Sequence, residues 1–257
     1  MPSHSLPKVS VLIPAFNEEK YILRTLSALM RQDYPCYEII IADNASTDRT
    51  AMVIQQFIDR QPVTAISIHL VYENKRGTNF ARECARQKAT GSIIAQIDAD
   101  CIPTANWLRK GVTALTRNRK TVAVTGPYDY YDGDKWMRTS SVLSQKIFYP
   151  LINKLVQFTG RAAILIGGNT FIRAAILESA GGYNTALTFY GDDVDMGKKL
   201  ATYGHVAYSS DLILFSSSRR YKANGFFQVN KKYQACFWNL VWKKDNLLQT
   251  AETSHPR

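Results

Sequence analysis

The stretch VSVLIPAFNEEKYILRTLSALMRQDYPCYEIIIADN, residues 9–44, places a segment of helical periodicity between two short apolar runs. The first run, VSVLIPAF (9–16), is almost wholly apolar and rich in β-branched residues, which favours a strand buried on both faces. The second run, YEIIIADN (37–44), has the same character. Apolar side chains recur at helical spacing between them, at Ile22, Leu26 and Leu29. The stretch therefore predicts a strand–helix–strand unit of a parallel sheet.

Polar residues stand where the predicted helices should begin. Asn17 is a candidate N-cap of the first helix, and Glu18 and Glu19 suit the positive end of its dipole. Ser46 or Thr47 is expected to cap a second helix, formed by STDRTAMVIQQFIDRQP.

The same alternation of strand and helix continues along the chain. ISIHLVY (66–72) predicts a strand, and GTNFARECARQKATG (77–91) predicts a helix with Phe80 and Cys84 on one stripe. SIIAQIDAD (92–100) predicts the next strand. Strands and helices in strict alternation indicate an α/β protein with a doubly wound sheet, which binds small molecules beyond the carboxyl ends of its strands.

The second half of the chain is less regular. TVAVTGPY (121–128) predicts a strand, and SVLSQKIFYPLINKLVQF (141–158) predicts an apolar helix broken at its proline. GGNTFIRAAILESAGG (167–182) predicts a loop, a short strand and a short helix that ends at paired glycines. YGDDVDMGKKL (190–200) opens a helix with three carboxylates, and HVAYSSDLILFSSSRR (205–220) holds one or two strands.

Three polar clusters follow the ends of predicted strands, at residues 17–19, 43–44 and 98–100. Because these ends meet at one edge of a parallel sheet, the clusters are expected to line one crevice. If the last strand continues through Asp98 and Asp100, the two carboxylates lie on one face and repel each other. No glycine loop of the dehydrogenase or P-loop type opens any helix, which argues against those two classes.

The charge of the chain points to an anionic partner. The formal net charge is +11, and residues 101–128 and 219–244 carry basic side chains without a single acidic one. Nucleic acid, an acidic membrane surface or a phosphorylated substrate would suit such a surface. No zinc-finger spacing or aromatic RNA-binding motif accompanies it, so specific nucleic-acid binding is not expected.

The cysteines and the N-terminus indicate a cytoplasmic protein. The four cysteines are scattered and form no CxxC pair, at Cys36, Cys84, Cys101 and Cys236. Free thiols suit a reducing compartment. The N-terminus does not have the pattern of a signal peptide, and no stretch of 18 apolar residues predicts a membrane-spanning helix.

Five motifs in order, IPAFNEE, ADNASTDRT, NKRGTNFARECARQKATGSIIAQIDADC, GGYN and GDDVDMGKKL, resemble the family 2 glycosyltransferases of GT-A fold over about residues 8–215. The resemblance implies a three-layer α/β fold with a mostly parallel sheet. It implies a GT-A domain at 1–225, with a nucleotide-sugar-binding half at 8–102 and a less regular acceptor half at 103–225. Residues 226–257 would form a basic amphipathic extension. The family transfers a sugar from a nucleotide-diphosphate donor to a hydroxyl, usually with inversion and with Mg²⁺ or Mn²⁺.

The resemblance also implies roles for residues of the first half. Asp100 would touch the metal, and Asp98 would lie between the metal and the ribose. Asp43 would accept a hydrogen bond from an N–H of the nucleobase, a group that uracil and guanine share. Other residues would line the nucleotide-sugar pocket: Pro14, Ala15, Glu18, Lys75, Gly77 and Ala99. A UDP-sugar is the favoured donor.

In the second half, the family pattern implies that Asp193 is the catalytic base, with Asp192 in place of the usual glutamate. SSRRY (217–221) lacks the glutamine and tryptophan of the Gln-x-x-Arg-Trp motif of processive synthases, which favours transfer of a single sugar. Arg219 or Arg220 would close over the diphosphate. The acceptor side would include Gly167, Gly168 and Asn169. His205 is either a third metal ligand or, more often for a lone histidine, a structural residue.

The tail, residues 225–244, is amphipathic. Its apolar side chains recur at helical spacing, at Phe226, Val229, Tyr233, Phe237 and Leu240, and four lysines accompany them. Such a helix suits anionic lipid at the inner face of the plasma membrane, or it packs on the domain or another subunit. A glycan or lipid-linked acceptor would fit the first interpretation. The alternative functions are a catalytically silent nucleotide-binding protein acting through its basic surface, and nucleic-acid binding through the tail.

Overall fold

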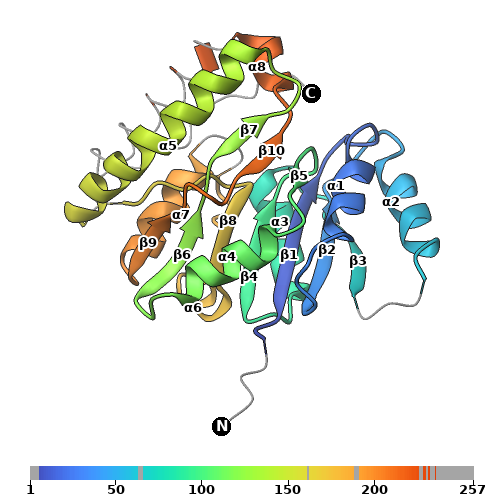
Figure 1. The fold of residues 1–257 in the computed structure, drawn as a ribbon. Coiled ribbons are helices and arrows are strands. Elements are labelled where there is room, and N and C mark those ends of the chain that lie inside the picture. The colour runs from blue at the N-terminus through green and yellow to red at the C-terminus, as the bar shows by residue number, and fades with distance from the viewer. Residues whose placement is uncertain are drawn as a thin grey trace.

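The computed structural model describes residues 6–62, 66–160, 162–187 and 191–225, together with residues 228, 229, 231 and 235. A seven-stranded sheet lies between two layers of helices, and a smaller three-stranded sheet adjoins it (Figure 1). The strands of the large sheet are β1 (Val9–Ala15), β2 (Tyr37–Asp43), β3 (Ser67–Tyr72), β4 (Ile93–Ile97), β6 (Thr121–Thr125), β8 (Asn169–Arg173) and β9 (His205–Tyr208). The small sheet contains β5 (Ile102–Pro103), β7 (Tyr128–Tyr130) and β10 (Leu214–Ser216).

The large sheet has the order β3-β2-β1-β4-β8-β6-β9, and only β8 runs antiparallel to its neighbours. The helices are α1 (Ile22–Leu29), α2 (Thr50–Asp59), α3 (Thr78–Lys88), α4 (Trp107–Thr116), α5 (Lys135–Phe158), α6 (Ala174–Ser179), α7 (Asp192–Ala201) and α8 (Arg219–Asn224). This arrangement confirms the predicted α/β fold with a mostly parallel central sheet.

The continuous apolar runs of the strands arise because both faces of the sheet are covered. Val11 and Ile13 belong to the core under α1, α2 and α4, whereas Leu12 belongs to the core under α3, α6 and α7. All three side chains are fully buried. Successive strand residues point to opposite faces, so each needs an apolar side chain.

The expected starts of the first two helices are wrong. Asn17 has a left-handed backbone (φ 54°) and does not cap α1, which begins only at Ile22. Its side-chain oxygen instead accepts a hydrogen bond from Thr47 N at 2.8 Å. The second helix begins at Thr50, whose backbone N–H donates to Asp48 Oδ1 at 2.9 Å. Asn17 therefore binds the loop after β2, and the first N–H of α2 is bound by Asp48 rather than by Ser46 or Thr47.

Two further expectations about helices are corrected. On α3 the buried stripe is formed by Asn79, Ala81, Arg82 and Ala85, whereas Phe80 and Cys84 are only half-buried. The helix at 141–158 is not broken, because α5 runs through Pro150 without interruption. Both of its halves are anchored. Gln145 Nε2 donates to Tyr128 O at 3.0 Å, and Asn153 Nδ2 donates to Val206 O at 2.9 Å.

The small sheet brings the end of the described chain back to the carboxyl edge of the large sheet. β10 pairs antiparallel with β5, which follows Asp100, and parallel with β7. The chain then enters α8 at Arg219, above the ends of β1 and β4 (Figure 1). The amphipathic tail predicted at 225–244 lies outside the described residues, apart from the five at 225, 228, 229, 231 and 235. Among the helices that are described, none is both long and apolar enough to cross a membrane.

Candidate active site

The polar clusters predicted to line a crevice lie at the carboxyl ends of the adjacent parallel strands β1, β2 and β4. Ala15, the last residue of β1, pairs with Asp43, and its carbonyl accepts a hydrogen bond from Asn44 N at 2.7 Å. Glu18 N donates to Thr50 Oγ1 at 2.7 Å, which ties the loop after β1 to the start of α2. The structure thus places Glu18 and Asp43 on adjoining loops, as the strand order predicts.

Asp43 is 5% exposed and carries an incompletely satisfied carboxylate. Its Oδ2 accepts a long hydrogen bond from Ser46 N at 3.3 Å. Its Oδ1 is buried and finds no hydrogen-bond partner in the part of the chain that the structure describes. A buried acceptor without a partner is unfavourable, so a ligand N–H at this oxygen would be stabilising.

Asn44 fixes the loop that carries Lys75 and Gly77. Its Nδ2 donates to Lys75 O and its Oδ1 accepts from Gly77 N, both at 2.7 Å. Gly77 has φ 144°, a conformation that L side chains rarely adopt, so glycine is needed where α3 begins. Beside this loop the guanidinium of Arg76 lies 4.7 Å from the centroid of the Phe16 ring.

Asp98 and Asp100 do not lie on one face of a strand, because β4 ends at Ile97 and the next residues turn. Each carboxylate instead faces a different arginine. Asp98 Oδ1 lies 3.5 Å from Arg82 Nη2, and Asp100 Oδ2 lies 3.0 Å from Arg219 Nη2. Positive charge from two other elements therefore offsets the repulsion expected between the two acids.

Arg82, on α3, joins three carboxylates. Only 6% of its side chain is exposed. Its Nη1 lies 2.9 Å from Asp192 Oδ2 and 3.8 Å from Asp193 Oδ1, in addition to the Asp98 contact. Burial by itself lowers the pKa of an arginine, but these carboxylates, Asp192 first, stabilise the charge and raise the pKa of Arg82. The guanidinium is therefore a fixed cation between α3, β4 and α7.

Asp193 lies in the first turn of α7 and is held more loosely than Asp192. Its Oδ2 accepts a hydrogen bond from Gly167 N at 3.0 Å, and 37% of the side chain stays exposed. Burial against its neighbours, and then repulsion from Asp192, raise the pKa of Asp193 to about 7, against the opposing effects of Arg82 and Gly167 N–H. The Asp193 carboxyl can therefore exchange a proton near neutral pH.

Gly167 and Gly168 allow the backbone to approach these acids. A Cβ on Gly167 would overlap Asp193 Oδ1, and a Cβ on Gly168 would overlap Asp98 Oδ2. Asn169, expected on the acceptor side, is instead fully buried. Its side chain accepts from Trp107 Nε1 at 2.9 Å and donates to Leu212 O at 2.7 Å, so it holds the core beneath the site. The expectation for Asn169 is wrong because amide hydrogen bonds within the core satisfy its side chain.

Arg219 closes the crevice from the side of α8. Its Nη2 contacts both Glu18 Oε1 and Asp100 Oδ2, and its guanidinium lies 4.7 Å from the centroid of the Tyr21 ring. Burial by itself lowers its pKa, but the hydrogen bond to Glu18 and the charge of Asp100 raise the pKa of Arg219. Arg219 is one of the two arginines predicted to face the diphosphate, and these contacts place it beside Asp100.

The family model described as Glycosyl transferase family 2 matches residues 10–181. The chain belongs to glycosyltransferase family 2. A probable glycosyltransferase of Bacillus subtilis, YdaM, is 30% identical over 182 residues, which cover 70% of this chain and 43% of that protein. An Escherichia coli enzyme, UDP-Glc:alpha-D-GlcNAc-diphosphoundecaprenol beta-1,3-glucosyltransferase WfgD, is 28% identical over 62% of this chain and 58% of its own length. The chain therefore spans about half of each of these curated relatives.

Among solved structures, the mannosyltransferase PcManGT of Pyrobaculum calidifontis, in complex with GDP-Man and Mn²⁺, superposes with a TM-score of 0.67. It is 25% identical, and the match covers 83% of this chain and 58% of that one. Family 2 membership and this GT-A likeness agree with the three-layer architecture described above.

The acids of this family 2 chain fit the metal that its family implies. Asp98 and Asp100 offer carboxylate oxygens, the hard ligands that Mg²⁺ and Mn²⁺ prefer, and 39% of the Asp98 side chain is exposed. No group of three or more potential ligands occurs within the described ranges. The other coordination positions would therefore fall to phosphate oxygens and water, as is usual for Mg²⁺.

His205 cannot join this pair. It begins β9 opposite Thr121, at the amino end of a strand, whereas Asp98 follows the carboxyl end of β4.

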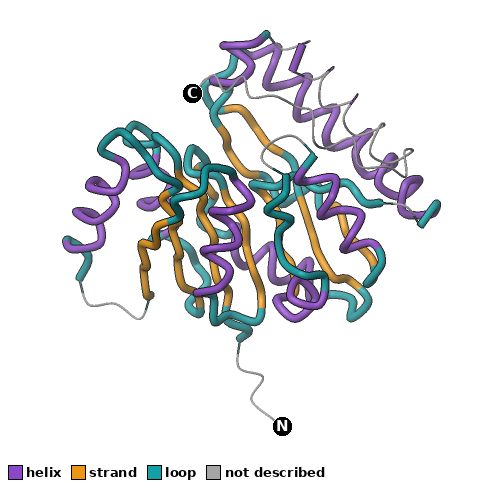
Figure 2. Tube along the Cα trace, turned by 180° about the vertical axis from the view of Figure 1, so that it is seen from behind, coloured by secondary structure: helices purple, strands orange, loops and turns teal. Residues whose placement is uncertain are grey.

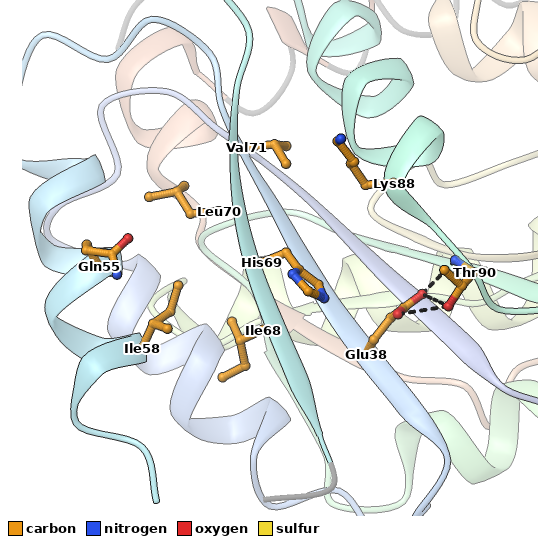
Figure 3. A pocket seen from close by; sticks show the side chains of 9 residues that line it. All are labelled: Glu38, Gln55, Ile58, Ile68, His69, Leu70, Val71, Lys88 and Thr90. Atoms are coloured by element: carbon orange, nitrogen blue, oxygen red, sulfur yellow. Dashed lines mark hydrogen bonds between the residues drawn. The ribbon is translucent and has the colours of Figure 1, made fainter. Parts of the chain in front are cut away.

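A cavity of about 470 Å³ lies beside the edge strand β3 and is lined in part by Glu38 and Thr90 (Figure 3). Glu38 is near the amino end of β2, so this cavity is remote from the acids at the carboxyl ends of the strands. Burial would raise the pKa of Glu38, but hydrogen bonds from Lys8, Ser10 and Thr90 lower it to about 2. This cluster stabilises the fold.

The sequence did not point to Arg82, and it placed Ala15 and Ala99 in the lining of the nucleotide-sugar pocket. Both alanine side chains are buried in the core, at 1% and 3% exposure, so only their backbone can line a pocket. Arg82 could have been found from its spacing, because it shares the buried stripe of α3 with Ala81 and Ala85. A basic residue between small apolar ones on a buried face needs an acidic partner.

Proposed function

We propose that the chain is a metal-dependent inverting glycosyltransferase that moves one sugar from a nucleotide-diphosphate sugar, with a UDP-sugar favoured, to a hydroxyl of a lipid-linked or cell-envelope glycan. The observation that carries this proposal is the position of Asp193. Arg82 bridges it to Asp98, so a candidate base stands beside a candidate metal ligand. The donor and acceptor named for the E. coli relative support the UDP-sugar and the lipid-linked acceptor.

Asp43 would bind the nucleobase through its unpartnered Oδ1. Uracil and guanine both offer an N–H to such an acceptor, so this contact selects a class of base. Lys75 and Gly77 lie on the loop that Asn44 fixes beside Asp43, where they can border the base and ribose.

Asp98 and Asp100 would hold Mg²⁺ or Mn²⁺, which when bound would neutralise charge on the departing diphosphate. Arg219 lies beside Asp100 and carries a planar guanidinium suited to phosphate oxygens, so it would orient the same diphosphate. Its contacts with Glu18 and Asp100 hold the guanidinium at this position.

Asp193 would act as the base. The acceptor oxygen bonds to the anomeric carbon on the face opposite the diphosphate, the bond from that carbon to the diphosphate breaks, and an Asp193 carboxylate oxygen takes the hydroxyl proton. Asp192 is held at 2.9 Å by Arg82 Nη1 and would orient that guanidinium.

The rate of transfer is expected to fall on the acid side of neutrality. Asp193 must be ionised to accept a proton, and its pKa is raised to about 7. The value of kcat/KM should therefore fall about tenfold per pH unit below this pKa and level off above it. A pH profile of transfer, measured with saturating Mn²⁺, tests this, and a flat profile through neutral pH would exclude Asp193 as the titrating base.

Replacing Asp43 with alanine is expected to abolish nucleotide binding without weakening the free protein. UDP at about 100 times its dissociation constant should add about 2.7 kcal/mol to the free energy of unfolding of the unaltered protein. D43A should lose that gain, because it removes the acceptor for the base, yet it also removes a buried oxygen without a partner. Thermal shift with UDP, GDP and dTDP measures both effects.

Asp59→Ala is the matched control for D43A, since Asp59 is an exposed acid on α2 bonded only to Gln55 among the hydrogen bonds described. It should keep the full nucleotide response. If D43A kept the response as well, the assignment of Asp43 to the nucleobase would be wrong.

A catalytically silent nucleotide-binding protein is the second candidate, and the ion pair between Asp100 and Arg219 favours it, because a metal ligand is already engaged. The two functions differ in one measurement. An enzyme hydrolyses some nucleotide sugar, or transfers the sugar from it, with Mn²⁺, whereas a silent protein shows a thermal shift without turnover.

We also propose that residues 225–244 make a peripheral contact with lipid at the inner face of the plasma membrane. Binding to DNA or RNA that weakens steeply with salt would instead favour a nucleic-acid role.

A further inference from the structure

Helix α5 carries an exposed apolar stripe that the crevice does not use. Among the described residues, seven of the twelve exposed large apolar side chains lie on this helix. Five of them recur every three or four residues, at Leu143, Ile147, Leu151, Leu155 and Phe158. Their exposed fractions run from 54% to 91%. At 1.5 Å per residue the stripe is about 22 Å long, so it forms one continuous face.

The opposite face of α5 is firmly anchored beside the candidate active site. Gln145 is buried and holds both backbone groups of Tyr128, at 2.9 and 3.0 Å. The hydroxyl of Tyr128 donates to Asp98 Oδ2 at 3.2 Å. Figures 1 and 2 show α5 along the outer margin of the molecule, beyond the small sheet. Whatever covers the stripe therefore lies about one helix diameter from the wall of the crevice.

The charges around the stripe select its occupant. Helix α5 contains four basic side chains and no acidic one, and one of the four, Arg138, pairs with Asp129 at 2.9 Å. Lys146 and Lys154 are exposed on α5 itself. A second copy of the chain, paired through a two-fold axis, would bring these lysines against each other. The tail of the chain is a poor cover for the same reason, because it carries four lysines between residues 231 and 244.

We infer that α5 lies in the surface of an anionic membrane and that its stripe enters the acyl boundary. Leucine, isoleucine and phenylalanine on one face with lysines and no acids are the pattern of an interfacial helix. The lysine stems can lie along the apolar face while their ammonium groups stay among anionic headgroups. This surface is distinct from the tail at 225–244, and it would hold the acceptor side of the crevice near lipid. The inference does not depend on sugar transfer.

Co-sedimentation of the full chain with vesicles tests the inference. The unaltered protein should bind vesicles of phosphatidylcholine with about 30% phosphatidylglycerol, and bind pure phosphatidylcholine much more weakly. The double variant L151Q/L155Q should reduce the partition coefficient by at least about tenfold, because two side chains no longer enter the acyl boundary. Its melting temperature should not fall, since both side chains are exposed.

L23Q/M52Q is the matched control, because Leu23 and Met52 are exposed apolar residues on α1 and α2. It should bind vesicles like the unaltered protein. Three outcomes would overturn the inference: no binding of the unaltered protein to anionic vesicles, unchanged binding of L151Q/L155Q, or a fall in its melting temperature that shows the stripe is covered by the chain. Dissociation of a dimer by L151Q/L155Q would overturn it too. Donor hydrolysis by the same variant, expected at the unaltered rate, reports separately on the proposed function.

Discussion

Replacing Asp193 with asparagine is expected to lower kcat for sugar transfer by about 1,000-fold, the usual contribution of a general base. The amide keeps the shape of the side chain and still accepts the hydrogen bond from Gly167 N, but it cannot take a proton. Donor binding should persist, because the expected metal ligands and Asp43 are unchanged. Steady-state transfer with Mn²⁺, alongside a thermal shift with the nucleotide, separates the two effects.

The same substitution is expected to stabilise the free protein above neutral pH. Asp193 has a folded pKa raised to about 7 from the ordinary aspartate value of 3.8, so the folded state binds its proton more tightly than the unfolded state. Stability is therefore lost as the pH rises between these values, and asparagine removes that loss. Replacing an acid that is kept for catalysis at the expense of stability should raise the free energy of unfolding, whereas replacing an acid that stabilises the fold should lower it.

Asp195→Asn is the control on the same turn of α7, since Asp195 pairs with Lys199 at 3.4 Å and is remote from the Gly167 contact. It should leave kcat within about twofold, as expected for an exposed pair. Equal losses in D193N and D195N would point to damage of α7 rather than to a base. Full activity in D193N would assign the base to another residue, with Asp192 the next to test.

The parallel sheet and the position of the polar clusters at one of its edges could be predicted because they follow from local patterns. Apolar runs alternating with helical periodicity fix a parallel sheet, and a parallel sheet gathers the carboxyl ends of its strands at one edge. Asp43 and Asp98 were therefore placed correctly at one edge without knowledge of any contact. The helix starts failed for a related reason. Asn17 and Ser46, both expected as caps, bind across the two loops instead: Asn17 Oδ1 accepts from Thr47 N, and Ser46 Oγ accepts from Asn17 N.

What the sequence could not show is which polar groups pair across the fold. Asn169 follows two glycines and suits an exposed loop, yet Trp107, 62 residues away, binds its side chain in the core. The spacing of Arg82 on α3 indicates a buried arginine, but its partner Asp192 is 110 residues away, so the sequence does not show which acid it meets. Contacts at such separations depend on how the layers pack, and no local pattern records them.

Arg82 links the two halves of the site, so its loss is expected to have the second largest effect. Arg82→Leu should lower the free energy of unfolding by about 1.5–3 kcal/mol at pH 8, because three partly exposed carboxylates lose the buried counter-ion that they share. Arg82 lowers the pKa of Asp193, so without this cation the folded pKa of Asp193 rises and the folded state gains protons on acidification. The difference in free energy of unfolding between R82L and the unaltered protein should therefore shrink as the pH falls toward about 5. Urea unfolding at several pH values measures this change.

Arg86→Leu is the matched control for R82L, one turn further along α3. Arg86 pairs with Glu83 at 2.7 Å, but both side chains are partly exposed, so the cost should be about 1 kcal/mol or less and should depend little on Asp192 or Asp193. The double variant R82L/D192N should recover part of the R82L deficit, since it removes one of the uncompensated charges. If R82L and R86L cost the same at every pH, the three carboxylates would not depend on Arg82. The proposed coupling between the metal ligand and the base would then be wrong.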